Sequence, residues 1–137
     1  MIKRKGFSQK VREEVFRKYD GHCAYCGKVI TPTDFQVDHL IPVASAQFGK
    51  YDEYEIDCFS NYMPACRRCN HYKRAHSLET FRKYIEEIPE KLREDYIYKV
   101  GLDYGLVEDH PRKIVFYFEE IEAEKQELKE AINYESK

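Results

Sequence analysis

Two Cys-x-x-Cys pairs constrain the fold of this chain more than any other feature of its sequence. The pairs are Cys23–Cys26 and Cys66–Cys69. Each pair places two sulfurs on one side of a tight turn, so one metal ion bound by both pairs would hold two distant segments together. Residues 27–65 separate the pairs, a longer gap than a simple zinc ribbon has. The chain is therefore expected to form a structured insert between them.

The ligand chemistry indicates which metal ion the two pairs would bind. Thiolates are the preferred ligands of structural zinc, so we expect Zn²⁺ held by four cysteines. His22 or His71 would replace a cysteine only if one cysteine were idle. A redox site of the thioredoxin type is disfavoured, because one pair would suffice and no βαβ pattern surrounds either. The fifth cysteine, Cys58, is expected to be a small buried hydrophobic residue.

Composition limits the class of protein. The sequence has 137 residues, 42% hydrophobic and 35% charged, which suits one soluble globular domain. No apolar run approaches ~18 residues, so we expect no membrane span. Met1 to Gly6 is basic, but no apolar segment follows it, and a secretory signal is not expected. The expected compartment is therefore a reducing cytoplasm, where five cysteines, an odd number, favour metal binding over disulfides.

Charge is unevenly distributed along the sequence. The formal net charge is −2, yet residues 1–19 and 61–84 are strongly basic. Acidic residues are concentrated in residues 52–57 and after Phe118. One basic segment leads into the first Cys pair and the other includes the second pair. Together they predict an electropositive face on a nearly neutral protein, as nucleic-acid binding would need.

The hydrophobic pattern predicts an α+β domain, with strands where apolar residues alternate and helices where they recur every three or four residues. Ser8 and Ser77 are placed to cap helices. The expected elements are helices from Ser8 to about Tyr19, from about Cys69, after Ser77 as far as Pro89, at 90–100 and from Glu119, with strands at 35–37 and 113–118.

Polar residues suited to a second metal site lie close to the cysteines. Asp38 and His39 follow the strand at 35–37, and Asn70 follows the last cysteine. Carboxylate and amide oxygens suit a hard divalent cation, and an imidazole can take a proton from water near neutral pH. Adjacent residues leave a regular strand on opposite sides, so Asp38 and His39 require a bend or a strand end.

The segments Val37–Pro42 and Cys66–Lys73, with Asn61 between them, resemble the HNH endonuclease family, including its small phage-type members. Its first histidine falls on His39 and its middle asparagine on Asn61. The last position is Asn70, where asparagine in place of histidine is a common variant. The resemblance implies a ββα-metal core clamped by zinc, with flanking helices and a C-terminal strand and helix.

The resemblance covers residues 10–85, with 89–137 as a C-terminal extension of a single domain spanning 1–137. It implies hydrolysis of DNA phosphodiester bonds, with His39 activating water and Asp38 and Asn70 holding one Mg²⁺ or Mn²⁺. Products would carry 5′-phosphate and 3′-hydroxyl ends. Asn61 would support the loop that presents His39. Four cationic side chains around the metal helix are predicted to contact DNA phosphates: Arg67, Arg68, Lys73 and Arg74.

Two other interpretations stay open. A non-catalytic zinc module that binds DNA or protein would explain the cysteines and basic segments, but not Asp38, His39 and Asn70 together. A packaging or assembly factor could dock through the acidic helix after Phe118. The same helix could instead pack on a second copy of the chain, so the sequence leaves open a homodimer and a phage packaging partner, with a bacterial host or a phage as the source. The sequence indicates no target sequence.

Overall fold

The computed structural model describes residues 6–136. Lys3, Arg4 and Lys5, which belong to the first basic segment, lie outside the described residues. The contacts divide the chain into two compact units. The first comprises residues up to Ala75 together with those from Val115 onward, and the second is His76–Ile114. The single domain over 1–137 stays a prediction.

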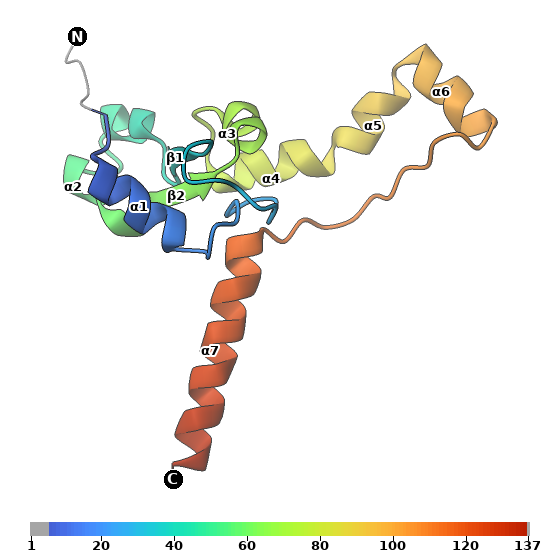
Figure 1. Ribbon diagram of the computed structural model, residues 1–137. Coiled ribbons are helices and arrows are strands. Elements are labelled where there is room, and N and C mark those ends of the chain that lie inside the picture. The colour runs from blue at the N-terminus through green and yellow to red at the C-terminus, as the bar shows by residue number, and fades with distance from the viewer. Residues whose placement is uncertain (1–5, 137) are drawn as a thin grey trace. The chain divides into compact units, whose positions relative to one another are not determined.

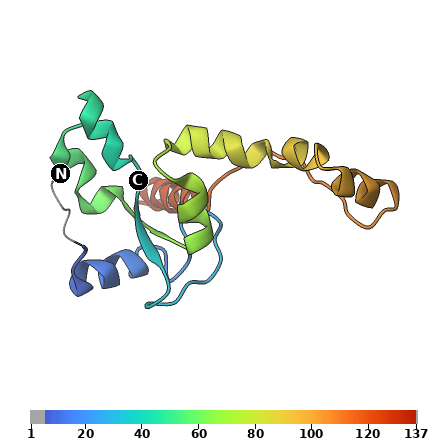
Figure 2. The ribbon, with the colours of Figure 1, turned by 90° about the horizontal axis from the view of Figure 1, so that it is seen from above.

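The centre of the first unit is a two-stranded antiparallel sheet followed by a helix. β1 (Gln36–His39) pairs with β2 (Tyr62–Ala65), with Gln36 opposite Ala65 and His39 opposite Tyr62. α3 (Arg67–Lys73) follows β2 directly and packs on β1, as Figures 1 and 2 show. This β-β-α arrangement, with the four cysteines gathered beside it, confirms the predicted α+β fold.

Among the described residues of the first unit, four short helices flank this core, and the 19-residue helix α7 extends away from it (Figure 1). Ser8 caps α1, as predicted, because its hydroxyl accepts a hydrogen bond from the Val11 amide at 3.2 Å. Asp52 and Glu55 form a capping box on α2. The elements are α1 (Gln9–Arg17), the 3₁₀ helix η1 (Val43–Phe48), α2 (Glu53–Ile56), the 3₁₀ helix η2 (Phe59–Asn61) and α7 (Tyr117–Glu135).

A small hydrophobic core lies where α1 packs on β2. Val15 of α1 and Ile56 of α2 have no exposed surface, and Phe35 and Met63 are 4% exposed. Burial of such side chains contributes about 1.5–3 kcal/mol each. The core therefore holds β1 and β2 in one register, which fixes the face on which each polar residue of β1 lies.

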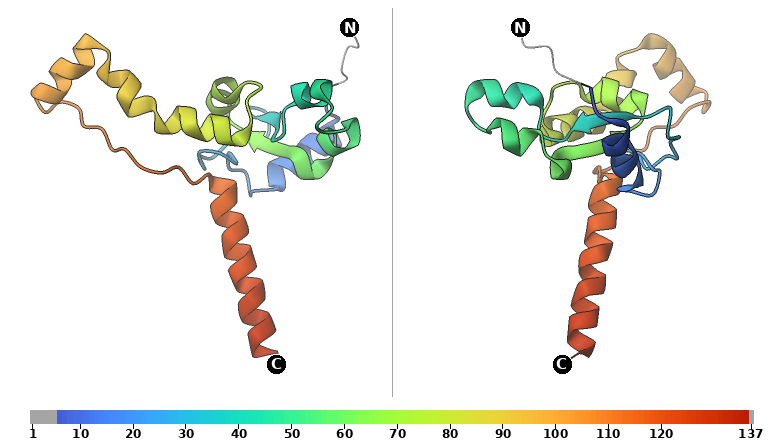
Figure 3. Two further views of the ribbon diagram at one scale, coloured as in Figure 1. Left: turned by 180° about the vertical axis from the view of Figure 1, so that it is seen from behind. Right: turned by 60° about the vertical axis from the view of Figure 1, so that its left-hand side comes forward.

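The second unit consists of three consecutive helices, seen in yellow and orange in Figure 3. Ser77 caps α4 as predicted, accepting a hydrogen bond from the Thr80 amide at 3.2 Å. Arg93 binds Asp109 through two hydrogen bonds of 2.7 and 2.8 Å, which connect the loop after the third helix, α6, to the end of α5. The helices are α4 (Leu78–Glu86), α5 (Ile88–Arg93) and α6 (Tyr96–Asp103).

Some predicted elements differ from those observed. The strand expected at 113–118 is wrong: residues 107–116 form no helix or strand, and α7 already begins at Tyr117. The helix expected at 90–100 is two helices, because the Asp95 side chain caps a new one. Pro89 lies in the first turn of α5, where a missing N–H is tolerated. No helix in residues 6–136 combines the length and apolar character needed to cross a bilayer.

Candidate functional site

The four cysteines of the two pairs come together as one cluster. Cys23 and Cys26 lie in the turn after α1, and Cys66 and Cys69 lie at the start of α3. All four sulfurs lie within 4.8 Å of one another, and those of Cys26 and Cys66 are 3.9 Å apart. In a tetrahedron with metal–sulfur bonds of about 2.3 Å, the sulfurs would be about 3.8 Å apart. The cluster therefore fits a zinc ion.

Hydrogen bonding within the cluster perturbs its acidity. A hydrogen bond from the Cys69 thiol lowers the pKa of Cys23 to about 4, although burial opposes this shift. That same bond, followed by burial, raises the pKa of Cys69, because a second negative charge would form beside the first. Burial also raises the pKa of Cys26. A bound dication would remove this conflict by favouring all four thiolates.

Backbone hydrogen bonds position the first Cys pair against the rest of the unit. The Ala24 amide donates to the Pro64 carbonyl at 2.8 Å, which places the turn on β2. Gly27 has a φ of 78°, a conformation that favours glycine, and its amide closes the turn by donating to Cys23. From the start of α7, the Phe118 amide donates to the Ala24 carbonyl at 2.8 Å. The turn is thus held from two sides.

Asp38 lies at the centre of a buried polar cluster. It is 8% exposed, and Lys73, which has no exposed surface, places its Nζ 3.0 Å from Oδ2. The hydroxyl of Tyr25 donates to the same oxygen at 2.5 Å. Burial, and next the charge of Asp38, raise the pKa of Tyr25 well above its usual value. Within residues 6–136, Oδ1 of Asp38 accepts no hydrogen bond.

Asn70 lies near Asp38 on the facing helix. Asn70 and Lys73 are three residues apart on one face of α3, and Gln36 and Asp38 share one face of β1. The Asn70 amide nitrogen donates to the Gln36 side chain, just as Lys73 binds Asp38. In the described part of the chain, the Asn70 side-chain oxygen has no hydrogen-bond partner. The free oxygens of Asp38 and Asn70 are donors of the kind that a hard divalent cation prefers.

His39 belongs to a different side-chain environment. Its Nε2 lies 2.9 Å from Oδ1 of Asp57, and its ring contacts the rings of Phe7 and Tyr62 at centroid distances of 5.7 and 5.4 Å. These residues line a cavity of about 440 Å³. The β1–β2 ladder runs through His39, so its side chain leaves the opposite face from Asp38. Among the described residues, no hydrogen bond or ion pair joins the His39 side chain directly to the side chain of Asp38 or Asn70.

The strand does end at His39, and the chain bends at Leu40 and Ile41. The carbonyl of His39 accepts a hydrogen bond from Nζ of Lys73 at 3.0 Å, so this one ammonium group binds both residues of the Asp38–His39 pair. Sequence reasoning missed Asp57 as the partner of His39. The acidic segment at 52–57 was visible, but the spacing singled out none of its members.

Asn61 braces the loop that follows His39. It is 4% exposed, and its side-chain oxygen accepts from the Ile41 amide at 2.8 Å. Its amide nitrogen donates to the carbonyls of Ile41 and Ile56 at 3.1 and 2.9 Å. The Leu40 amide donates to the Asn61 carbonyl at 2.9 Å. A residue that supports the loop after His39 would form hydrogen bonds of this kind.

Asn61→Ala is expected to lower the free energy of unfolding by about 2–4 kcal/mol, because it leaves the part-buried backbone groups of Ile41 and the buried carbonyl of Ile56 without their partner. Urea denaturation followed by circular dichroism would measure this change. Asn133→Ala, at an exposed position on α7, is the matched control and should change stability little. A midpoint for Asn61→Ala equal to that of the control would contradict the bracing role.

The four predicted phosphate-binding residues differ in how far their side chains are exposed to solvent. Arg67, Arg68 and Arg74 are exposed, although Arg67 forms an ion pair with Asp34 at 2.9 Å. Lys73 differs from the other three, because its side chain has no exposed surface and its ammonium group binds Asp38 rather than facing solvent. The reason is that α3 turns Lys73 toward β1, on the same face as Asn70.

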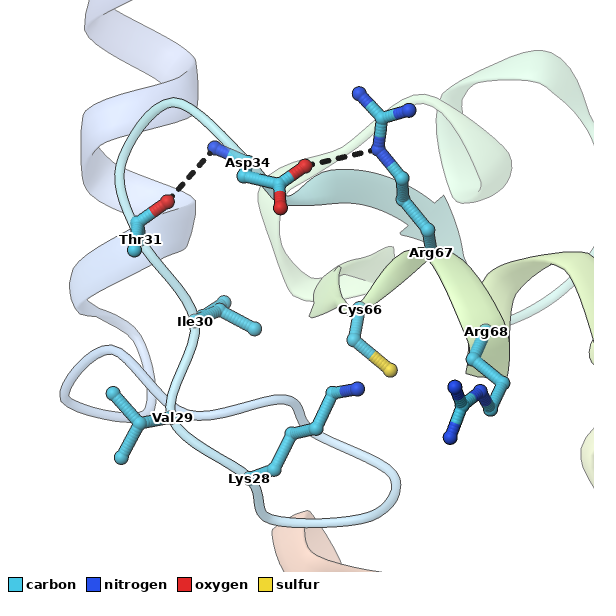
Figure 4. A pocket seen from close by; sticks show the side chains of 8 residues that line it. All are labelled: Lys28, Val29, Ile30, Thr31, Asp34, Cys66, Arg67 and Arg68. Carbon is cyan, nitrogen blue, oxygen red and sulfur yellow. Dashed lines mark hydrogen bonds and ion pairs between the residues drawn. The ribbon is translucent and has the colours of Figure 1, made fainter.

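A basic hollow of about 600 Å³ lies beside the second Cys pair (Figure 4). Lys28, from the loop after the first pair, and Arg68, from α3, line it together with Cys66. Figure 4 shows the Arg67 side chain extending to Asp34, with which it forms an ion pair at the upper edge of the hollow. Sequence reasoning missed Lys28, whose only signal was its position two residues after Cys26. Cationic side chains close in sequence to each of the two Cys pairs therefore line the same hollow.

Comparison with known proteins identifies the segment that carries this site. Residues 23–76 match the family model described as HNH endonuclease, which confirms the predicted family. No curated protein matches the chain. The crystal structure of the Type II-C Cas9 enzyme from Actinomyces naeslundii is similar over 58% of this chain, with a TM-score of 0.45 and 24% sequence identity. The match covers 9% of that protein.

Proposed function

Because residues 23–76 belong to the HNH endonuclease family, we propose that this chain is a metal-dependent endonuclease that hydrolyses phosphodiester bonds in DNA. One observation carries the proposal: α3 and β1 face each other with a free oxygen on Asp38 and another on Asn70. Both residues lie in the matched segment, as does His39. A merely structural zinc domain would have no need for two such oxygens beside a buried lysine.

Asp38 and Asn70 are the residues that would hold Mg²⁺ or Mn²⁺, with water and phosphate oxygens at the other positions. When bound, the ion would neutralise charge at the scissile phosphate and at the departing 3′-oxygen. Lys73 fixes the orientation of the Asp38 carboxylate by binding its Oδ2. The products would carry 5′-phosphate and 3′-hydroxyl ends.

His39 is proposed to take the proton from the attacking water. If Nε2 carries the hydrogen that Asp57 accepts, Nδ1 keeps a lone pair for that proton. Asp57 and Tyr62 hold the ring in place. Since Asp38 and His39 leave opposite faces of β1, the phosphate is proposed to lie at the strand end, next to Leu40, where it could approach both residues.

DNA is proposed to bind along the exposed arginines of α3 and the basic hollow. Arg68 and Lys28 present cationic groups there, and Arg74 follows α3. Such side chains contact phosphates and carry no sequence information, so we expect weak sequence selectivity. Zn²⁺ in the four-cysteine cluster would hold this surface together without taking part in the chemistry.

Arg68→Ala is expected to weaken DNA binding and to reduce the magnitude of the slope of log K against log[salt] by about 1, because one phosphate contact is lost. Fluorescence anisotropy with labelled duplex DNA, from about 50 mM to about 200 mM salt, would measure both. Lys129→Ala, an exposed cation on α7, is the control and should keep the wild-type slope. Equal slopes in the two variants would rule out Arg68 as a contact.

Relaxation of supercoiled plasmid by zinc-loaded protein tests the proposed function. With Mg²⁺ or Mn²⁺ we expect nicked or linear DNA, and with EDTA none. His39→Ala, purified in parallel, controls for contaminating nuclease. Protein that holds zinc and binds DNA but cuts nothing would favour the non-catalytic zinc module. The observation that supports this alternative is that Oδ2 of Asp38 already binds the ammonium group of Lys73.

Compartment and partners are also proposals. Five free cysteines suit a reducing cytoplasm, and we propose that location. A homodimer, a phage packaging partner and an origin in a phage or its bacterial host stay predictions, since no comparison supports them.

A further inference from the structure

Tyr25 connects the cysteine cluster to the proposed divalent-ion site. It lies between Cys23 and Cys26, and its side chain reaches β1, where the hydroxyl donates to Oδ2 of Asp38 at 2.5 Å. The single side chain of Tyr25 therefore connects the Cys23–Cys26 turn directly to the Asp38 carboxylate.

The ring of Tyr25 has little freedom to move. It is 3% exposed, and the rings of Phe116 and Phe118 pack against it in T-shaped arrangements at centroid distances of 5.6 and 6.2 Å. Its carbonyl accepts a hydrogen bond from the Tyr117 amide at 3.1 Å. Because the backbone on either side of Tyr25 carries a cysteine of the cluster, the position of the hydroxyl depends on the geometry of that turn.

Two donors from different elements converge on one carboxylate oxygen. Tyr25 approaches Oδ2 of Asp38 from the turn, and Nζ of Lys73 approaches it from α3. Lys73 is itself fixed by the carbonyl of His39. With Oδ2 held in this way, the carboxylate cannot rotate, and Oδ1 is the oxygen left for a cation.

We propose that Tyr25 is a positioning residue: anchored by the zinc-binding turn, it holds Oδ2 of Asp38 so that Oδ1 is presented to the divalent ion. This inference rests on the proposed function and deepens it. It means that the structural metal influences the affinity for the catalytic one. Partners that orient a metal ligand typically contribute 10- to 100-fold to metal affinity.

The test compares Tyr25→Phe with Tyr117→Phe on zinc-loaded full-length protein. Each variant loses one hydroxyl, and Tyr117 packs beside the same turn, on Gly27 and on the ring of His22. Zinc content and thermal melting would show that both variants fold. Isothermal titration with Mn²⁺ would measure binding without reference to activity, and Mn²⁺-dependent cleavage would be measured at low and saturating metal.

For Tyr25→Phe we expect full zinc content and a dissociation constant for Mn²⁺ raised about 10- to 100-fold. Its cleavage rate should recover as Mn²⁺ increases, and Tyr117→Phe should behave as wild type. A Tyr25→Phe variant that melts earlier but binds Mn²⁺ as wild type does would make Tyr25 merely structural and overturn the inference alone. Wild-type protein that neither binds Mn²⁺ nor cuts DNA would overturn the proposed function as well.

Discussion

Cys66→Ser is expected to abolish zinc binding and to unfold the first unit. Structural zinc contributes about 10–16 kcal/mol to small domains, as much as the entire stability of a typical domain, about 5–15 kcal/mol. Here the cluster joins the turn after α1 to the start of α3, across an insert that holds both strands. The sulfur of Cys66 also accepts the Cys69 amide, a helix-capping role that the serine hydroxyl can keep, so the expected unfolding comes from the lost metal ligand.

Zinc stoichiometry and near-UV circular dichroism would measure the result, since twelve tyrosines supply the signal. Cys58→Ser is the matched control. Cys58 is half-buried, less so than expected, and its sulfur contacts the Ser60 hydroxyl at 3.1 Å, outside the cluster. This variant should keep its zinc and its spectrum. A Cys66→Ser protein with native near-UV signal would show that the core folds without the metal.

The parts of the site that follow from local chemistry were predictable from the sequence. Cys-x-x-Cys spacing determines where sulfurs lie, whatever surrounds them, so the cluster needed no tertiary information. Ser8 and Ser77 cap their helices for the same reason, because each bond joins residues three apart. The helix carrying Asn70 followed from its position after the last cysteine.

Other features depend on contacts between distant segments and could not be predicted. β2 contains Pro64, which argues against a strand, yet pairing with β1 forms it at a sheet edge. Lys73 reads as a surface cation, and only the packing of α3 on β1 buries it against Asp38. Residues 113–116 show a strand pattern but find no partner strand among the described residues.

His39→Ala is expected to lower the rate of DNA cleavage by about 10²- to 10⁴-fold, the usual contribution of a general base. The side chain is 15% exposed and borders an open cavity, so its removal should leave the fold intact. Asp38 and Asn70 bind other partners, so Mn²⁺ affinity should also be unchanged. This combination, lost rate with metal binding retained, distinguishes a proton acceptor from a metal ligand.

The measurement is single-turnover nicking of plasmid at saturating Mn²⁺. His110→Ala is the control, because His110 is an exposed histidine of the second unit whose ring nitrogen lies 3.5 Å from Glu108. It should cleave at the wild-type rate. If His39→Ala also cleaves at that rate, then Asp57 holds His39 for structural reasons and another group takes the proton. If His39→Ala loses Mn²⁺ binding together with cleavage, His39 lies close enough to the ion to act as a ligand, and the separation of the two faces of β1 does not persist in the active enzyme.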